Sequence, residues 1–461
     1  MTISPSSFLT SSLRGTSWGG KVSRIMAASL SAVHPYQVIQ DQLFREGNLL
    51  NLPGHVLDLD KFSGITLLSV GKAALPLAVS SANLIENKLN GAYILTKKGK
   101  ADQPERFKKQ LRIFTGGHPI PDQDSLQATT EILSRLSSLK EDELVLVLIS
   151  GGSSALLTSP VEGVTLEDLQ KTNQVLLSCG ADIVEINTLR KHLSRVKGGQ
   201  LARILQPAHI YTLILSDVIG DHIDMVGSGP TAPDPTTYAD ALAVVANYQL
   251  EEVLPHSVIT WLEQGRQGKQ PETPKPGDPA FKNVSNLILS NNQQALEAGA
   301  EQARIEGFHT NTLPQFLVGE ARDVGRKLAK QLTELSLKDR PFPSPACLIA
   351  GGETTVTLTD SNQTGKGGRN LETALSALPL LDGLENIALI TLATDGEDGP
   401  TDAAGAVVTG DSYQRCQQLG FKPEDHLDGH DSYTAFESLD DLLRTGPTGT
   451  NVNDMCFLFT F

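Results

Sequence analysis

Short, almost continuously apolar runs alternate with stretches of helical periodicity along most of the chain. In the first half, these runs occupy residues 64–70, 92–95, 144–149 and 210–215. Runs of this kind predict strands covered on both faces, and strands that alternate with helices predict βαβ units around a parallel sheet. Comparable runs return at residues 286–290, 346–350, 356–358 and 387–393. We therefore expect an α/β fold throughout.

Proline and glycine divide the chain into parts. Residues 264–280 hold four prolines and three glycines but no large apolar residue, which is typical of a loop or a domain linker. We predict a doubly wound α/β domain over residues 23–265, a linker over 266–283 and a second α/β domain over 284–461. Residues 1–22 form an N-terminal extension in this division.

The first 40 residues contain no Asp or Glu. This acid-free start is rich in Ser and Thr and carries Arg14, Lys21 and Arg24, so it is similar to an organellar transit peptide. Residues 25–38 already have the pattern of an amphipathic helix, which leaves only about the first 20 residues as dispensable. Two readings stay open: a cytoplasmic protein with a disordered tail, or a mitochondrial or plastid protein with a transit peptide.

Composition narrows the classes of protein to consider. The hydrophobic fraction of 39% and the charged fraction of 20% are ordinary for a globular protein, and no apolar run reaches the roughly 18 residues of a membrane span. The net charge of -15 argues against nucleic acid as a partner, because phosphate backbones require a basic face. The four cysteines lie far apart and form no Cys-x-x-Cys pair, so we expect neither a structural zinc site nor a disulfide framework.

Several polar loops follow the predicted strands, where open α/β sheets bind ligands. Lys72 follows the first strand, and the loop Ser150-Gly151-Gly152-Ser153-Ser154 follows the strand at 144–149. This serine–glycine loop could form a nest of N–H donors for an anion or be an ordinary tight turn. His118 is interpreted as a structural residue.

Basic and acidic residues follow in the next segments. Arg190 and Lys197 lie seven residues apart, which would place them on one helix face, either toward a ligand or toward solvent. Asp217 follows the strand at 210–215 and could bind a metal, act as a base or cap a turn. Gly227 and Gly229 belong to a further polar loop.

The segment from Gly365 to Glu372 combines three glycines with Lys366 and Arg369. It follows a predicted strand that ends in Gly351-Gly352-Glu353, and it precedes an acidic loop with Asp395 and Asp398. Glycine N–H groups and fixed cations can hold phosphate, and the carboxylates could hold a divalent cation, so the combination suggests phosphoryl transfer. The P-loop, the GxGxxG dinucleotide motif and the GxSxG hydrolase elbow are all missing from the sequence.

In this order, the motifs resemble those of the class II glycerate kinases, the glycerate 2-kinase family whose C-terminal part is called the MOFRL domain. The resemblance covers nearly the whole chain after about residue 23. The hydrophobic pattern also predicts helices and strands over this span. The matching stretches are VGKA (70–73), GGHPIPD (116–122), LISGGSSALL (148–157), NTLRKHLSRVKGGQLA (187–202), LSDVIGD (215–221), GSGPT (227–231), GGETTV (351–356), GKGGRNLE (365–372), TDGEDGPTDAAGA (394–406) and GPTGTNVND (446–454).

The resemblance implies ATP-dependent phosphorylation of D-glycerate at its 2-hydroxyl, with Mg²⁺. It implies two three-layer α/β/α domains, the first Rossmann-like with a mostly parallel sheet, and an active site in the cleft between them. Lys72 and Arg369 match the two cations regarded as essential in the family. A monomer or homodimer, acting on small molecules and not on a membrane, is expected.

On this basis we assign roles to the candidate residues. Ser150 to Ser154 and Arg190 would bind the glycerate carboxylate, and Asp217 would be the base for the 2-hydroxyl. Asp395 and Asp398 would bind Mg²⁺. Phosphate or nucleotide binding is assigned to Lys197, Gly227, Gly229, Gly351, Gly352, Glu353, Gly367, Gly368 and Asn370.

Two alternatives remain at this point. One is a hydroxypyruvate reductase, which would need a nicotinamide site although the usual glycine motif is missing. The other is a non-catalytic sensor that binds a small anion with the same loops.

Overall fold

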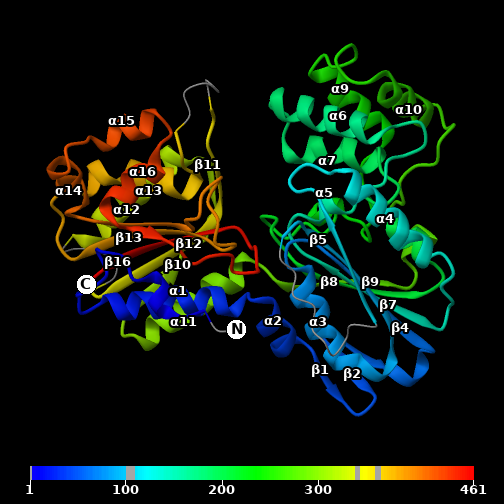
Figure 1. Cartoon of the computed structure of the whole chain (residues 1–461), viewed down its shortest axis with the longest axis horizontal. Helices are drawn as coiled ribbons and strands as arrows, with labels where there is room; N and C mark the ends of the chain where they lie inside the picture. The colour runs from blue at the N-terminus through cyan, green and yellow to red at the C-terminus, as the bar shows by residue number, and fades with distance from the viewer. Residues whose placement is uncertain (1–2, 100–109, 338–342, 359–364) are drawn as a thin grey trace. The chain divides into compact units, whose positions relative to one another are not determined.

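The computed structural model describes residues 3–99, 110–337, 343–358 and 365–461 (Figure 1). The chain forms two compact units, each of which is described by itself. The central unit is Val38–Leu289, and the terminal unit combines Met1–Gln37 with Ser290–Phe461.

The central unit is built on a six-stranded sheet in the order β6-β5-β4-β7-β8-β9. These strands are β4 (Gly64–Val70), β5 (Leu89–Lys97), β6 (Leu111–Gly116), β7 (Glu143–Ile149), β8 (His209–Leu215) and β9 (Val284–Ser290). The pairs from β6 to β8 are all parallel. If the six strands are numbered along the chain, their order in the sheet is 3-2-1-4-5-6, which is the Rossmann order. Successive strands are added on one side of β4 up to β6 and on the other side from β7 onward, so the topological switch point lies between β4 and β7. The predicted Rossmann-like parallel sheet is confirmed.

Apolar side chains cover both faces of this sheet. Leu67 and Leu68 are neighbours on β4, yet they belong to two different core clusters, because successive strand residues point to opposite faces. Helices α2 (Pro35–Gln42) and α3 (Ala74–Ile85) contribute to one cluster, and α4 (Gln123–Arg135) and α8 (Gln200–Leu205) contribute to the other.

Four further helices of the central unit gather around their own apolar cluster (Figure 1). They are α6 (Leu166–Ser178), α7 (Ile183–His192), α9 (Tyr238–Asn247) and α10 (His256–Arg266). A small antiparallel sheet of β1 (Phe44–Glu46), β2 (Leu49–Leu52) and β3 (His55–Asp58) completes the unit. The helical group matters for function because α6 and α7 extend the unit beside the loops that follow β7.

The terminal unit has a mixed seven-stranded sheet. Its strands are β10 (His309–Thr312), β11 (Leu317–Glu320), β12 (Ala346–Thr355), β13 (Ile387–Ala393), β14 (Gly405–Thr409), β15 (Leu442–Leu443) and β16 (Asp454–Thr460). Both β10 and β11 pair with β12 in parallel, whereas β12, β16, β13, β14 and β15 follow one another antiparallel. The strand predicted at residues 356–358 is wrong, since β12 ends at Thr355.

Helices cover both faces of this second sheet as well. On one face, α1 (Gly19–Ala32) and α11 (Asn292–Ile305) pack with Ile349 and Phe457. On the other, α12 (Ala321–Ser336), α13 (Arg369–Leu381) and the short α14 (Ser412–Gln418), α15 (Pro423–Asp428) and α16 (Ser432–Leu439) pack with Ala350 and Leu458. The predicted three-layer α/β architecture is therefore present.

The compact units differ from the predicted domain boundaries. Within residues 3–22, Phe8 and Leu13 are buried in the core of the terminal unit, so this segment is packed and not a free extension. The predicted linker is also part of a unit: the buried Thr273 hydroxyl donates a hydrogen bond to Asp234 at 2.9 Å, and both residues lie in the central unit. None of the helices in the described ranges is long and apolar enough to cross a membrane.

Candidate active site

The loops after β4 and β7 meet where the strand order of the central sheet reverses. The Lys72 N–H donates to the carbonyl of Gly151 at 2.8 Å, and the Ala73 N–H donates to the Ser150 hydroxyl at 3.1 Å. These two bonds hold the lysine loop against the serine–glycine loop. A crevice at such a switch point is the usual ligand site of a doubly wound sheet.

Gly152 allows two polar side chains to approach this turn. Its φ is +85°, and a Cβ at this position would lie 2.9 Å from the His118 Cδ2 and 3.3 Å from the Lys72 Cγ. Any larger residue would be strained and would push His118 away. The sequence favours a structural over a catalytic role for His118 and does not indicate this proximity, because the two residues are 34 positions apart, from 118 to 152.

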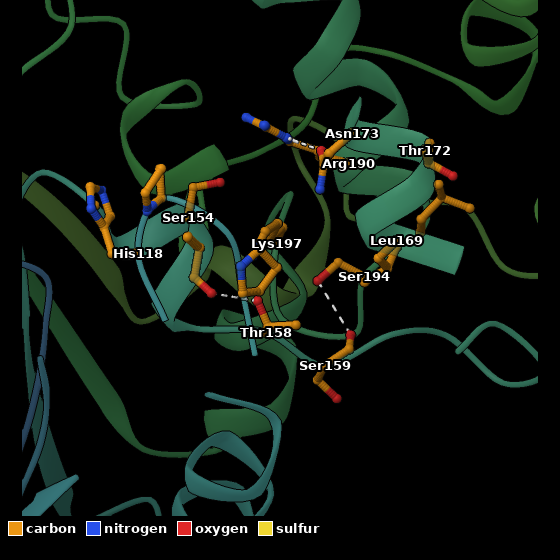
Figure 2. A pocket seen from close by; sticks show the side chains of 15 residues that line it. His118, Ser154, Thr158, Ser159, Leu169, Thr172, Asn173, Arg190, Ser194 and Lys197 are labelled. Atoms are coloured by element: carbon orange, nitrogen blue, oxygen red, sulfur yellow. Dashed lines mark hydrogen bonds between the residues drawn. The ribbon is translucent and has the colours of Figure 1, made fainter. Parts of the chain in front are cut away.

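A cavity of about 230 Å³ opens beside this turn (Figure 2). His118 and Gly152 line it from loops, Ser154 lines it from the short helix α5 (Ser153–Leu156), and Arg190 lines it from α7. Lys197 belongs to the loop after α7 and lines the same cavity. The predicted shared helix face of Arg190 and Lys197 is therefore wrong, since α7 ends at His192, but the chain turn after it brings both cations together.

Neutral oxygens hold the two cations. The Arg190 Nε donates to the Asn173 Oδ1 at 2.7 Å, and the Lys197 Nζ donates to the carbonyl of Leu157 at 2.6 Å. Within the described part of the chain, neither forms an ion pair with a carboxylate. Burial lowers the pKa of Arg190, and burial together with the charge of Arg190 lowers the pKa of Lys197 to about 7. Because Arg190 is half-buried and Lys197 is buried, and neither has a carboxylate partner in the described ranges, a small anion is the favoured occupant.

The predicted loop of Gly227 and Gly229 does not line this cavity but contacts residues that do or that lie next to them. The Gly198 N–H donates to the Ser228 carbonyl at 2.9 Å, and the Ser228 hydroxyl lies 2.8 Å from that of Ser154. Gly227 packs directly against the Ser153 hydroxyl, which is buried and has no hydrogen-bond partner among the residues that the structure describes. Asp217 follows β8 and does not line this cavity.

A second cavity, of about 620 Å³, lies in the terminal unit. Gly367, Gly368 and Arg369 line it at the start of α13, and Asp395 lines it from the loop after β13. The Arg369 Nε donates to Asp454 at 2.6 Å, and the Arg369 guanidinium also pairs with Glu353. Although burial opposes it, the charges of these two carboxylates hold the pKa of Arg369 above its ordinary value.

Asp398 holds the start of α13. Its carboxylate accepts hydrogen bonds from the N–H groups of Asn370 at 3.0 Å and Leu371 at 2.8 Å. Burial raises the pKa of Asp398 to about 7. In the described residues, no group of three or more His, Cys, Asp or Glu side chains is arranged to hold a metal ion. Metal binding by Asp395 and Asp398 stays a prediction.

The other predicted residues of this region lie around the cavity and not in its lining. Gly351 and Gly352 are within β12, where Gly351 packs against the Asn292 side chain and Gly352 against the backbone of Leu317. Asn370 is buried inside α13. Glu372 and His430 also line the cavity, and no role was predicted for either. They contact each other across 58 residues of sequence, so no local pattern indicates the contact.

Together, a Rossmann-ordered sheet, a cationic cavity at its switch point and a glycine-rich loop beside Arg369 define an α/β enzyme that acts on small anions. Residues 21–263 match the sequence profile of a domain of unknown function, DUF4147, and residues 346–454 match the MOFRL family. The glycerate 2-kinase of Pyrococcus horikoshii is 38% identical over 94% of this chain and 95% of its own length. The D-glycerate 2-kinase of Thermotoga maritima is 39% identical over the same shares.

The structural comparison agrees. The crystal structure of glycerate kinase from Thermotoga maritima is similar with a TM-score of 0.82 at 38% identity, over 95% of this chain and 98% of that one. A relative from Agrobacterium vitis, 43% identical over 84% of this chain, is provisionally named a hydroxypyruvate reductase. The chain belongs to the glycerate kinase family, and the resemblance predicted from its motifs is confirmed.

Proposed function

We propose that this chain transfers the γ-phosphoryl group of ATP to the 2-hydroxyl of D-glycerate. The observation that carries the proposal is the pair of half-buried Arg190 and buried Lys197, which face one small cavity without a carboxylate partner in the described residues. The carboxylate of a small acid could pair with both and would offset one positive charge. The names of the Pyrococcus and Thermotoga relatives support glycerate as that acid.

The smaller cavity is the proposed glycerate site. The substrate carboxylate would accept hydrogen bonds from Arg190 and Lys197, and the Ser154 hydroxyl would bind a substrate oxygen. This moves Lys197 from the nucleotide group to the substrate group. The loop from Ser150 to Gly152 would hold the reacting end of glycerate near Lys72, because its backbone already bonds to the Lys72 loop.

The larger cavity is the proposed phosphate site. Gly367 and Gly368 offer a close approach to the backbone, and Arg369 adds a fixed charge. In phosphoryl transfer, most of the catalysis comes from neutralising charge on the transferred group, which is the role proposed for Lys72 and Arg369. The predicted reaction site in a cleft between the domains stays a prediction.

We propose that Mg²⁺ binds on the acidic side of the larger cavity. Mg²⁺ is usually held by one or two carboxylates together with waters and substrate phosphates, so a complete protein cage is unnecessary. Asp395 lines the cavity and would supply such a carboxylate, with Asp398 beside it. When bound, the ion would neutralise charge on the phosphate oxygens.

Phosphorus NMR of the purified protein with D-glycerate, ATP and Mg²⁺ tests the reaction and its position. We expect a new phosphomonoester signal that matches 2-phosphoglycerate. In the same assay, Lys72→Ala and Arg369→Ala should each lower the rate by about 10²-fold or more, the usual loss for one electrostatic donor. Lys330→Ala, which removes an exposed cation on α12, is the matched control and should keep the wild-type rate.

Each other outcome has a definite meaning. A 3-phosphoglycerate signal would keep the kinase and overturn the position of transfer. No phosphomonoester, together with NADH oxidation on addition of hydroxypyruvate, would replace the proposal with the reductase alternative.

A further inference from the structure

A buried carboxylate–histidine pair lines the cavity beside Arg369. Glu372 is in the first turn of α13, and its side chain is only 3% exposed. Its Oε2 lies 2.9 Å from the His430 Nδ1, and its Oε1 accepts hydrogen bonds from the Arg322 Nε at 3.1 Å and Nη2 at 2.9 Å. Both Glu372 and His430 line the cavity of the glycine-rich loop.

These contacts determine how the imidazole is used. Glu372 is paired with the guanidinium of Arg322, so it acts as an acceptor and the His430 Nδ1 donates the hydrogen bond between them. The Nδ1 position is thereby occupied, and Nε2 is the nitrogen left to interact with a ligand. No hydrogen bond to the His430 Nε2 occurs among the described residues.

The backbone also holds the ring in place. His430 follows α15 with a φ of +51°, in the left-handed region, and its N–H donates to the Leu427 carbonyl at 3.2 Å. Asn, Asp and His are the residues other than Gly that most often adopt this conformation. The backbone of His430 is thereby held at the cavity wall, and the contact with Glu372 orients its ring.

The charge balance of the cavity indicates what His430 would bind. Arg369 is already paired with Asp454 and Glu353, and Asp395 adds further negative charge. A phosphate in this cavity would need another donor to offset these carboxylates. His430 supplies one on the wall that Glu372 forms.

We propose that His430, in the protonated form in which both ring nitrogens are donors, donates a hydrogen bond from Nε2 to a phosphate of the nucleotide, while Nδ1 donates to Glu372, which positions the ring. This inference rests on the proposed function, because it takes the larger cavity as the nucleotide site. It assigns His430 to nucleotide affinity and gives it no part in glycerate binding.

Two substitutions separate this role from a structural one. His430→Asn suits the left-handed backbone and keeps an amide donor for Glu372, but it removes the atom at the Nε2 position. We expect a KM for ATP about tenfold higher, the usual loss for one charge-assisted hydrogen bond, and a KM for glycerate within about twofold of wild type. His430→Gln restores a donor near the Nε2 position and should recover part of the ATP affinity.

His426→Gln is the matched control. His426 pairs with Asp431 at 3.2 Å in the same way, but it does not line the cavity, so this variant should keep both KM values. Melting temperatures of all variants exclude misfolding. If His430→Asn keeps the wild-type KM for ATP, the pair is structural and the inference is wrong.

Direct ATP binding without glycerate separates this inference from the proposed function. If ATP affinity falls in His430→Asn but the wild-type protein phosphorylates no glycerate, the inference stands and the function fails. If wild type phosphorylates glycerate and His430→Asn binds ATP as tightly as wild type, the function stands and the inference fails.

Discussion

Single side chains show how this protein separates two kinds of cation. Arg369 is paired with two carboxylates, and their charges stabilise its protonated form. Arg190 and Lys197 are held by neutral oxygens, and burial works against their charge. The carboxylates around Arg369 hold its positive charge in a fixed position. Arg190 and Lys197 instead keep positive charge that is not compensated by a carboxylate in the described residues, and a substrate anion can pair with it.

The lowered pKa of Lys197 makes glycerate binding depend on pH. Burial and the charge of Arg190 lower this pKa from 10.5 to about 7, so the free amine loses its proton as the pH rises through about 7. A bound carboxylate favours the charged amine and raises its pKa. Below pH 7 the affinity should therefore be nearly constant, and above it the affinity should fall while binding takes up a proton.

Calorimetric titration with glycerate between pH 6 and 8.5, in two buffers of different ionisation enthalpy, measures this uptake. Lys197→Gln should abolish it. Equal proton uptake in the variant and the wild type would show that another group titrates.

Residue chemistry was predictable from sequence where neighbouring residues carry it. The serine–glycine loop after β7 and the cations Lys72, Arg190 and Lys197 were recognisable, since each stands in an unusual local pattern. The sequence did not show why Arg190 and Lys197 lie close together. Their proximity depends on a turn of the chain after His192 and not on helical spacing. The contact between Glu372 and His430 was unpredictable for the same physical reason: it forms between distant segments.

Helices and strands show the same division between local and distant information. The apolar runs 64–70 and 387–393 match β4 and β13 as observed. Strand β16 was not predicted, although it lies in the middle of the second sheet between β12 and β13. Its partners are far away in sequence, so its place and its antiparallel direction are consequences of tertiary packing.

The N-terminal segment is the element whose predicted role changes most. The Ser12 N–H and hydroxyl both donate to the buried Asp441 carboxylate at 2.8 Å, and Arg415 donates to the same carboxylate at 2.7 Å. Trp18 stacks on Phe461 with ring centroids 3.9 Å apart. These contacts make residues 3–18 an ordered N-terminal segment that packs against the rest of the terminal unit.

Loss of the contacts made by this N-terminal segment should destabilise the protein. Leu13→Ala leaves a cavity in a fully packed position and should cost about 2–5 kcal/mol, while Ser7→Ala at an exposed position should cost almost nothing. Deletion of residues 1–18 should lower the melting temperature further. Thermal unfolding followed by circular dichroism measures all three. An unchanged melting temperature after the deletion would restore the reading of a dispensable extension.

Over the whole molecule, a net charge of -15 coexists with local sites for anions. Binding does not follow the overall charge, because cations gathered in a small cavity determine the local potential. The two cavities lie in different compact units, the cationic one in the central unit and the glycine-rich one in the terminal unit. We propose that the cationic cavity binds glycerate and that the glycine-rich cavity binds the phosphates of the nucleotide.

Calorimetric titration of D-glycerate into the Arg190→Ala and Arg369→Ala variants, without nucleotide, tests which cavity binds glycerate. We predict that Arg190→Ala weakens glycerate binding by about 10- to 100-fold, since it removes a charge-assisted hydrogen bond to the carboxylate. Arg369→Ala should bind glycerate as tightly as the wild-type protein does. Wild-type affinity in Arg190→Ala, or a loss confined to Arg369→Ala, would contradict the assignment of glycerate to the central unit.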